Sequence, residues 1–86
     1  MSKMNGFDYQ APAELFARAG RGARSRPVTY RRFDSGAEAV QFAIEELTAE
    51  ALLGTVVESD EERYEAAQIR ALYDSRAYPL KRRDVV

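Results

Sequence analysis

The chain has 86 residues, with 13 basic and 14 acidic side chains and a formal net charge of -1. A chain of this length forms one domain, and folding then removes only roughly 60% of the surface that the unfolded chain exposes. Cysteine and histidine are both absent, which excludes disulfides and thiolate metal sites and removes the commonest general base. We therefore expect a cytoplasmic protein with no cofactor, no metal site, no catalysis and no membrane association.

The near-neutral total hides a separation of charge along the chain. The six arginines of the first third are Arg18, Arg21, Arg24, Arg26, Arg31 and Arg32. The following segment, residues 34–65, is strongly acidic, and the tail is basic again. A pattern of this kind often neutralises itself within a fold or across a dimer. We favour pairing of the arginines with the acidic segment over binding of nucleic acid, which stays open as the alternative.

The first third of the chain predicts little regular structure. We expect residues 1–11 to be poorly ordered. The stretch "APAELFARAG" is typical of a short helix, because Pro12 suits a first helical position and Gly20 suits a left-handed end. The next stretch, "RGARSRP", has no apolar periodicity and is predicted to be a loop.

A strand and a helix follow. The stretch "VTYRRF", residues 28–33, is rich in β-branched and aromatic residues and predicts a strand. Ser35 and Glu38 have the S-x-x-E spacing of a capping box, so we expect a helix to begin there. Its apolar positions have the 3.6-residue period and are Ala37, Val40, Ala43, Ile44 and Leu47.

The second half predicts one more strand and one more helix. In "TAEALLGTVVES" the leucines extend the helix by a turn before Gly54, and "TVVES" is a strand. Two starts are open for the last helix: Ser59 and Glu62 repeat the capping-box spacing, which would begin it near Asp60. The alternative is that "DEER" prolongs the strand and the helix begins near Glu65. We expect residues 81–86 to be a disordered basic tail.

These elements define a small two-layer α/β (α+β) domain over residues 12–80, in the order helix, loop, strand, helix, strand, helix. A sheet of only two strands has two unpaired edges and covers little core. We therefore expect a homodimer in which a second copy completes or covers the sheet.

We expect the arginine cluster to face a partner, and within it we select Arg24, Arg26, Arg31 and Arg32. The predicted function is a small non-catalytic interaction module with an unidentified protein partner. The alternative is a nucleic-acid-binding regulator, loosely of the ribbon-helix-helix type, that uses the cluster at residues 18–32 for phosphate or base contacts. The carboxylates lie in polar runs, where a solvated helix face explains them better than acid–base chemistry.

One resemblance adds to these patterns. The stretch "YRRFDSGAEAVQFAIEEL", followed by "LLGTVVESDEERYEAAQIRALYDSRAYPL", resembles a family of short bacterial proteins that carry no assigned activity. The resemblance covers about residues 30–80. It implies a cytoplasmic, single-domain bacterial protein of unknown function, and it transfers no functional residue.

Overall fold

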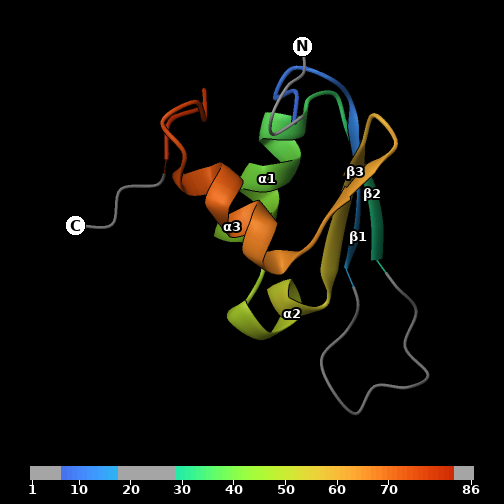
Figure 1. The fold of residues 1–86 in the computed structure, drawn as a ribbon. Coiled ribbons are helices and arrows are strands. Elements are labelled where there is room, and N and C mark those ends of the chain that lie inside the picture. The colour runs from blue at the N-terminus through green and yellow to red at the C-terminus, as the bar shows by residue number, and fades with distance from the viewer. Residues whose placement is uncertain (1–6, 18–28, 83–86) are drawn as a thin grey trace.

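The computed structural model of the protein describes residues 7–17 and 29–82. The strands are β1 (Ala13–Ala17), β2 (Thr29–Phe33), β3 (Thr55–Ser59) and β4 (Glu62–Tyr64). The helices are α1 (Gly36–Glu45), α2 (Ala49–Leu53) and α3 (Ala66–Asp74). The strands form one antiparallel sheet in the order β2-β1-β3-β4, and α1 and α3 pack side by side on one of its faces (Figure 1). The predicted mixed α+β class is confirmed.

Two β-hairpin–helix units build this sheet. The first unit is β1, β2 and α1, and the second is β3, β4 and α3, with α2 between them. The central strands β1 and β3 pair antiparallel, and Glu14 lies opposite Glu58. An approximate two-fold axis through that pair therefore relates the units, and Arg32 beside Glu14 corresponds to Arg63 beside Glu58.

The expected first helix is wrong, because "AELFA" forms the central strand β1. Its burial alternates with a period of two: Ala13, Leu15 and Ala17 are buried, whereas Glu14 and Phe16 are half-buried. Over five residues this alternation is hard to distinguish from one face of a short helix. Hydrogen bonding to β2 on one side and β3 on the other overrides the helical propensity of alanine and glutamate.

The strand at residues 28–33 and the helix after it are confirmed over most of their length. Ser35 caps α1, and its Oγ accepts a hydrogen bond from the Glu38 amide at 3.3 Å. The helix ends at Glu45, and the expected extra turn is a separate helix, α2, because the Thr48 hydroxyl accepts from the Ala51 amide and starts it anew.

Of the two starts considered for the last helix, the capping box at Ser59 and Glu62 does not form, and the later start is the one observed. The Ser59 hydroxyl instead donates to the Pro12 carbonyl at 2.8 Å, which joins the end of β3 to the start of β1. Asp60 and Glu61 form the turn between β3 and β4, and α3 begins at Ala66. The Glu65 amide donates to the Gln68 side chain at 2.8 Å, so the helix is capped at the later of the two positions considered.

The core lies between the sheet and the two long helices. Leu15 and Val57 are fully buried partners across β1 and β3, and Val40 of α1 and Ile69 of α3 are fully buried above them. Burial of a side chain of this size contributes about 1.5–3 kcal/mol. The antiparallel seam between the two units and the helix pair therefore form one continuous core.

The structure changes the reason given for dimerisation. We predicted two strands with two unpaired edges, whereas the described residues form four strands and a covered inner face. One chain thus supplies the sheet that we expected two chains to share. A homodimer stays a prediction without that support. No helix within residues 7–17 and 29–82 has the length and apolar character needed to cross a membrane.

Residues 7–11, expected to be poorly ordered together with 1–6, make specific contacts. The Phe7 ring lies edge-on to Tyr64 with centroids 4.9 Å apart, and the Tyr9 hydroxyl donates to the Leu72 carbonyl at 2.8 Å. Phe7 also packs against Gly36 so closely that a Cβ there would lie 2.6 Å from the ring. Glycine at the start of α1 therefore lets the N-terminal segment close over the core.

The C-terminal segment packs on α3 through a tyrosine cluster. Tyr78 is 6% exposed, and its ring lies 4.9 Å from Tyr73 and 6.2 Å from Tyr9. Arg82 donates to the Tyr73 carbonyl at 2.8 Å and lies over the Tyr78 ring.

The Tyr73 hydroxyl donates to Glu45 at 2.6 Å, whereas the buried Tyr78 hydroxyl has no hydrogen-bond partner among the described residues. Burial raises the pKa of Tyr78 to about 12.

We expect Tyr78→Phe to raise the free energy of unfolding at pH 7 by about 1 kcal/mol, because it removes a buried hydroxyl that lacks a partner. The folded-state pKa of Tyr78 lies above the ordinary value of 10.0. Ionisation of this phenol is therefore disfavoured in the folded state, so the free energy of unfolding is independent of this group below pH 10 and falls as the pH rises toward 12. Urea unfolding at pH 7 and at intervals up to pH 12 measures both effects, and the variant should lose less stability in the alkaline range.

Tyr73→Phe is the matched control. It removes the hydroxyl that donates to Glu45 and should lower the free energy of unfolding by about 1 kcal/mol. Equal effects of the two substitutions would contradict the assignment of the unpaired hydroxyl to Tyr78.

Candidate interaction surface

The structure separates the arginines selected from the sequence. Arg24 and Arg26 lie outside the described residues. Arg31 and Arg32 are neighbours in β2, so their side chains point to opposite faces of the sheet. Arg31 is on the side of the helices, and Arg32 is on the face that the helices leave open. The two described candidates therefore do not form one surface.

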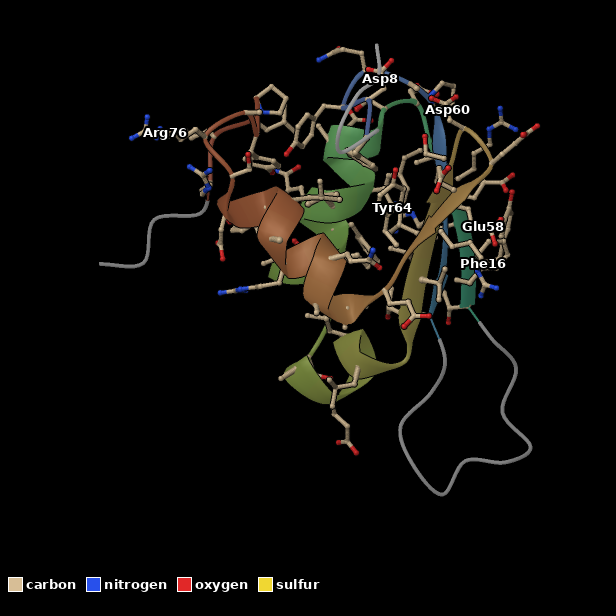
Figure 2. All side chains as sticks on the ribbon, viewed as in Figure 1. Asp8, Phe16, Glu58, Asp60, Tyr64 and Arg76 are labelled. Atoms are coloured by element: carbon tan, nitrogen blue, oxygen red, sulfur yellow. The ribbon has the colours of Figure 1, made fainter. Side chains whose placement is uncertain are left out.

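The open face of the sheet receives side chains from every strand. Because residues opposite each other in a ladder share a face, the register assigns its members. They are Glu14, Phe16, Tyr30, Arg32, Val56, Glu58 and Arg63. Figure 2 shows Phe16 and Glu58 on the side of the sheet away from α1 and α3, whereas Tyr64 points toward the helices.

One half of the open face is apolar. The rings of Phe16 and Tyr30 lie 5.2 Å apart, and Val56 is the partner of Phe16 on the next strand. Tyr30 is 53% exposed, one of the most exposed large hydrophobic side chains among the described residues. Aromatic residues in such positions supply contact area to a partner at a low cost in conformational entropy.

The other half is a symmetrical row of charges, Arg32, Glu14, Glu58 and Arg63, one from each strand. Like charges directly opposite each other in a sheet are destabilising, and the two glutamates form such a pair. Glu14 accepts a hydrogen bond from the Tyr30 hydroxyl at 2.9 Å, which raises the pKa of Tyr30. Glu58 lies 3.5 Å from Arg63. The centre of the open face is thus negative, with positive flanks.

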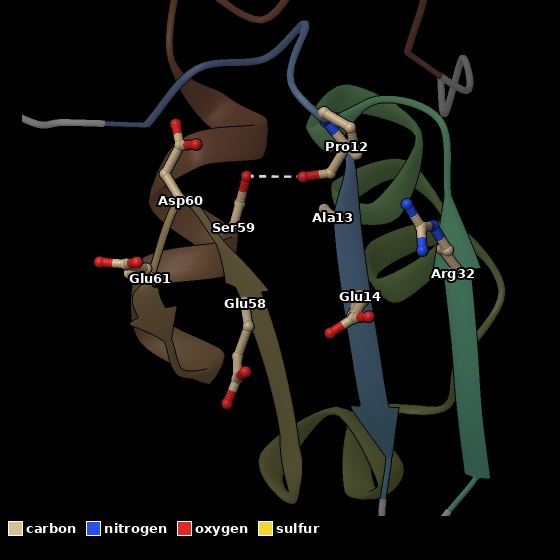
Figure 3. Close-up of a pocket in the computed structure, with 8 residues that line it drawn as sticks. All are labelled: Pro12, Ala13, Glu14, Arg32, Glu58, Ser59, Asp60 and Glu61. Atoms are coloured by element: carbon tan, nitrogen blue, oxygen red, sulfur yellow. Dashed lines mark hydrogen bonds between the residues drawn. The ribbon is translucent and has the colours of Figure 1, made fainter.

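A hollow of about 340 Å³ lies beside this row, toward the start of β1 and the end of β3 (Figure 3). Glu14, Glu58 and Arg32 line it on one side, and the β3–β4 turn lines it on the other. Both turn residues have left-handed backbones, with φ of 54° at Asp60 and 66° at Glu61. No group of acidic residues within the described ranges has the geometry to hold a metal ion.

A second hollow of about 620 Å³ lies on the helix side, between β2 and α1. Phe33 and Phe42 line it with ring centroids 5.6 Å apart. The Arg31 guanidinium lies 4.8 Å from the centroid of Phe42 and 5.3 Å from that of Phe33. Arg31 therefore packs against the aromatic floor by cation–π contact, and because it is also exposed, its partner-facing role stays a prediction.

The sequence analysis missed Glu14, Phe16 and Val56 as surface residues. The first two stood in the expected helix, and no sequence signal places them on a strand, because Phe16 is as apolar as its buried neighbours and the alternation of burial from Ala13 to Ala17 is visible only in the structure. Comparisons with family models, with curated proteins and with solved structures found no match for this chain. The resemblance to short bacterial proteins therefore stays a prediction.

We expect Glu61→Gly to raise the free energy of unfolding by about 1 kcal/mol. A side chain in the left-handed region costs roughly 1–2 kcal/mol, and glycine avoids most of that cost. Glu62→Gly, one residue later in extended β4, removes the same charge and should instead lower stability by about 0.5–1 kcal/mol. Thermal unfolding of both variants measures the contrast, and a loss of stability in Glu61→Gly would contradict the strain argument.

Proposed function

We propose that this protein is a small non-catalytic interaction module that binds another protein through the open face of its sheet. The observation that carries the proposal is the arrangement of that face: the exposed Tyr30 against the half-buried Phe16, beside a charged row with a negative centre. Interfaces commonly combine aromatic anchors with a polar rim. The complementary partner presents an apolar side chain to the aromatic pair and a cationic side chain to Glu14 and Glu58.

The charged row favours a different protein over a second copy. When two identical sheets stack in alignment on the Glu14–Glu58 pair, glutamate faces glutamate and arginine faces arginine, because the row reads the same from both ends. Like charges across an interface cost free energy. A homodimer formed by aligned stacking of these faces is thus disfavoured.

The same row favours protein over nucleic acid. The central glutamates repel phosphates, and each is held close to a partner of its own, Tyr30 or Arg63. Nucleic-acid binding by the arginines at 18–32 is the rival proposal, and four of its six arginines lie outside the described residues. The helix that follows α1 in the described topology, α2, has only five residues, and the β3–β4 hairpin separates α1 from the second long helix, α3.

The absence of catalysis is part of the proposal. It is supported by a sequence without histidine or cysteine, because the commonest general base and the most reactive nucleophile are then missing. We also propose a cytoplasmic location, in accordance with the cysteine-free composition.

We expect Tyr30→Ala to weaken binding to the protein partner about tenfold or more, which is the range of an aromatic interface anchor. Partners are captured with immobilised protein, purified, and then titrated by calorimetry against wild type and variant. Leu53→Ala is the matched control, because Leu53 is 77% exposed but belongs to α2, outside the open face. The Leu53→Ala variant should bind the protein partner with the same affinity as the wild type.

A titration of the protein against random duplex DNA and single-stranded RNA distinguishes the protein-interaction proposal from the nucleic-acid one. Phosphate binding by several arginines loses orders of magnitude in affinity between about 50 and 200 mM salt. Tight binding that collapses over this range, together with no loss of partner affinity in Tyr30→Ala, would replace the protein-interaction proposal with the nucleic-acid one. Light scattering at about 100 μM tests the homodimer, since that concentration is at the weak end of specific association.

A further inference from the structure

The open face of the sheet consists of two rows of side chains that lie two residues apart along the strands. The apolar row is Tyr30, Phe16 and Val56, and the charged row is Arg32, Glu14, Glu58 and Arg63. Phe16 and Glu14 are alternate residues of β1, and Val56 and Glu58 are alternate residues of β3. Because two residues of a strand span about 6.8 Å, a complementary partner presents an apolar group and a charged group at about that separation.

A partner segment that lies on this face has to satisfy its own backbone. The central strands β1 and β3 pair on both sides, so their amides and carbonyls are used within the sheet. A buried extended segment on top of them would leave its backbone groups without partners, whereas a helix satisfies most of its own. Four helical residues span about 6 Å, close to the separation of the two rows. A helix along the β1–β3 seam therefore presents an apolar residue to one row and, four positions away, a charged residue to the other.

The charge around the second row selects a cation for that position. The described residues of this row and of the hollow beside it carry two guanidinium groups and four carboxylates, those of Glu14, Glu58, Asp60 and Glu61 (Figure 3). The hydrogen bond to Glu14 and the ion pair of Glu58 each use one oxygen, Oε2. A carboxylate has about four acceptor sites, so both glutamates can accept further donors. A cation over the seam thus offsets the repulsion between the two facing glutamates.

The arginines at the two ends of the row select the neighbours of that cation. Arg32 and Arg63 lie one strand outside the glutamates, about 4.8 Å further from the seam. In a helix along the seam, the residues before and after the cation project about 100° to either side, toward these arginines. Acidic residues at both positions are attracted to the arginines, whereas basic residues are repelled.

We propose that the open face binds an amphipathic α-helix of another protein, which lies along the β1–β3 seam and carries an acidic–basic–acidic triplet with an apolar residue four positions from the central cation. The apolar residue packs on Phe16 and Tyr30, and the cation lies over Glu14 and Glu58. This inference rests on the proposed function, because it names the element that the open face receives. None of α1, α2 and α3 contains such a triplet, so the described helices of a second copy do not fit.

The probes are two alanine-rich peptides of about 20 residues, long enough to form a helix in water. The matched peptide carries a leucine and, four positions later, the centre of a Glu-Arg-Glu triplet. The inverted peptide carries Arg-Glu-Arg in its place, and both have the same composition because balancing charges are placed on the opposite helix face. Amide chemical shifts of the isotope-labelled protein measure binding up to about 1 mM peptide, the weak end of association. We expect the matched peptide to bind at least tenfold more tightly and to shift the amides of Phe16, Val56 and Glu58.

Variants of the protein and of the peptide test the two parts of the inference. Glu14→Gln/Glu58→Gln should lower the affinity for the matched peptide about fivefold, from two exposed charge interactions. Glu38→Gln/Glu50→Gln, on α1 and α2, removes the same charge from exposed positions outside the open face and should leave the affinity unchanged. A matched peptide with proline on its solvent-facing side should bind at least tenfold more weakly, because proline breaks the helix.

The outcomes separate this inference from the proposed function. Loss of partner affinity in Tyr30→Ala, together with equal binding of the matched and inverted peptides, would overturn the helix and leave the proposed function in place. Unchanged partner affinity in Tyr30→Ala would overturn the proposed function and the helix with it. No chemical-shift change at about 1 mM matched peptide, equal affinity of the proline peptide, or equal losses in the two double variants would also overturn the helix.

Discussion

The antiparallel pairing of β1 with β3 is the constraint on which the rest of the structure depends. It joins two β-hairpin–helix units that have no other shared strand, and it brings Leu15 against Val57 beneath both long helices. The same pairing places Glu14 opposite Glu58 on the open face. One register thus sets both the apolar core and the negative centre of the candidate surface, because a shift of one residue would exchange the two faces.

Local signals in the sequence predict the elements whose stabilising contacts are local. Ser35 and the 3.6-residue period identify α1, and β-branched residues identify β3. The sequence could not reveal β1 as a strand, because "AELFA" has good helix formers and acquires its extended form only through partners about 15 and 40 residues away. Ser59 shows the same limit, since its hydroxyl bonds to Pro12, 47 residues earlier, rather than to a helix of its own.

The candidate site shows the same difference between what local sequence signals predict and what distant contacts decide. Composition drew attention to the arginines, but two adjacent strand residues face opposite ways, so Arg31 packs against Phe42 while Arg32 joins the charged row. Whether an arginine meets an aromatic ring or a glutamate depends on the strand register and on the helix packed behind it. Residue type alone predicts a charged surface, whereas the pairing of strands decides which charges share it.

The two-unit architecture has a consequence for how the chain can be divided. Each unit keeps its own hairpin and its own long helix, and α2 with its flanking residues is the covalent link between them (Figure 1). A cut in that link leaves two fragments whose shared seam is the β1–β3 ladder and the α1–α3 contact. The two fragments can therefore restore one sheet and one core only by reassembling along this seam, as the halves of a split reporter protein do.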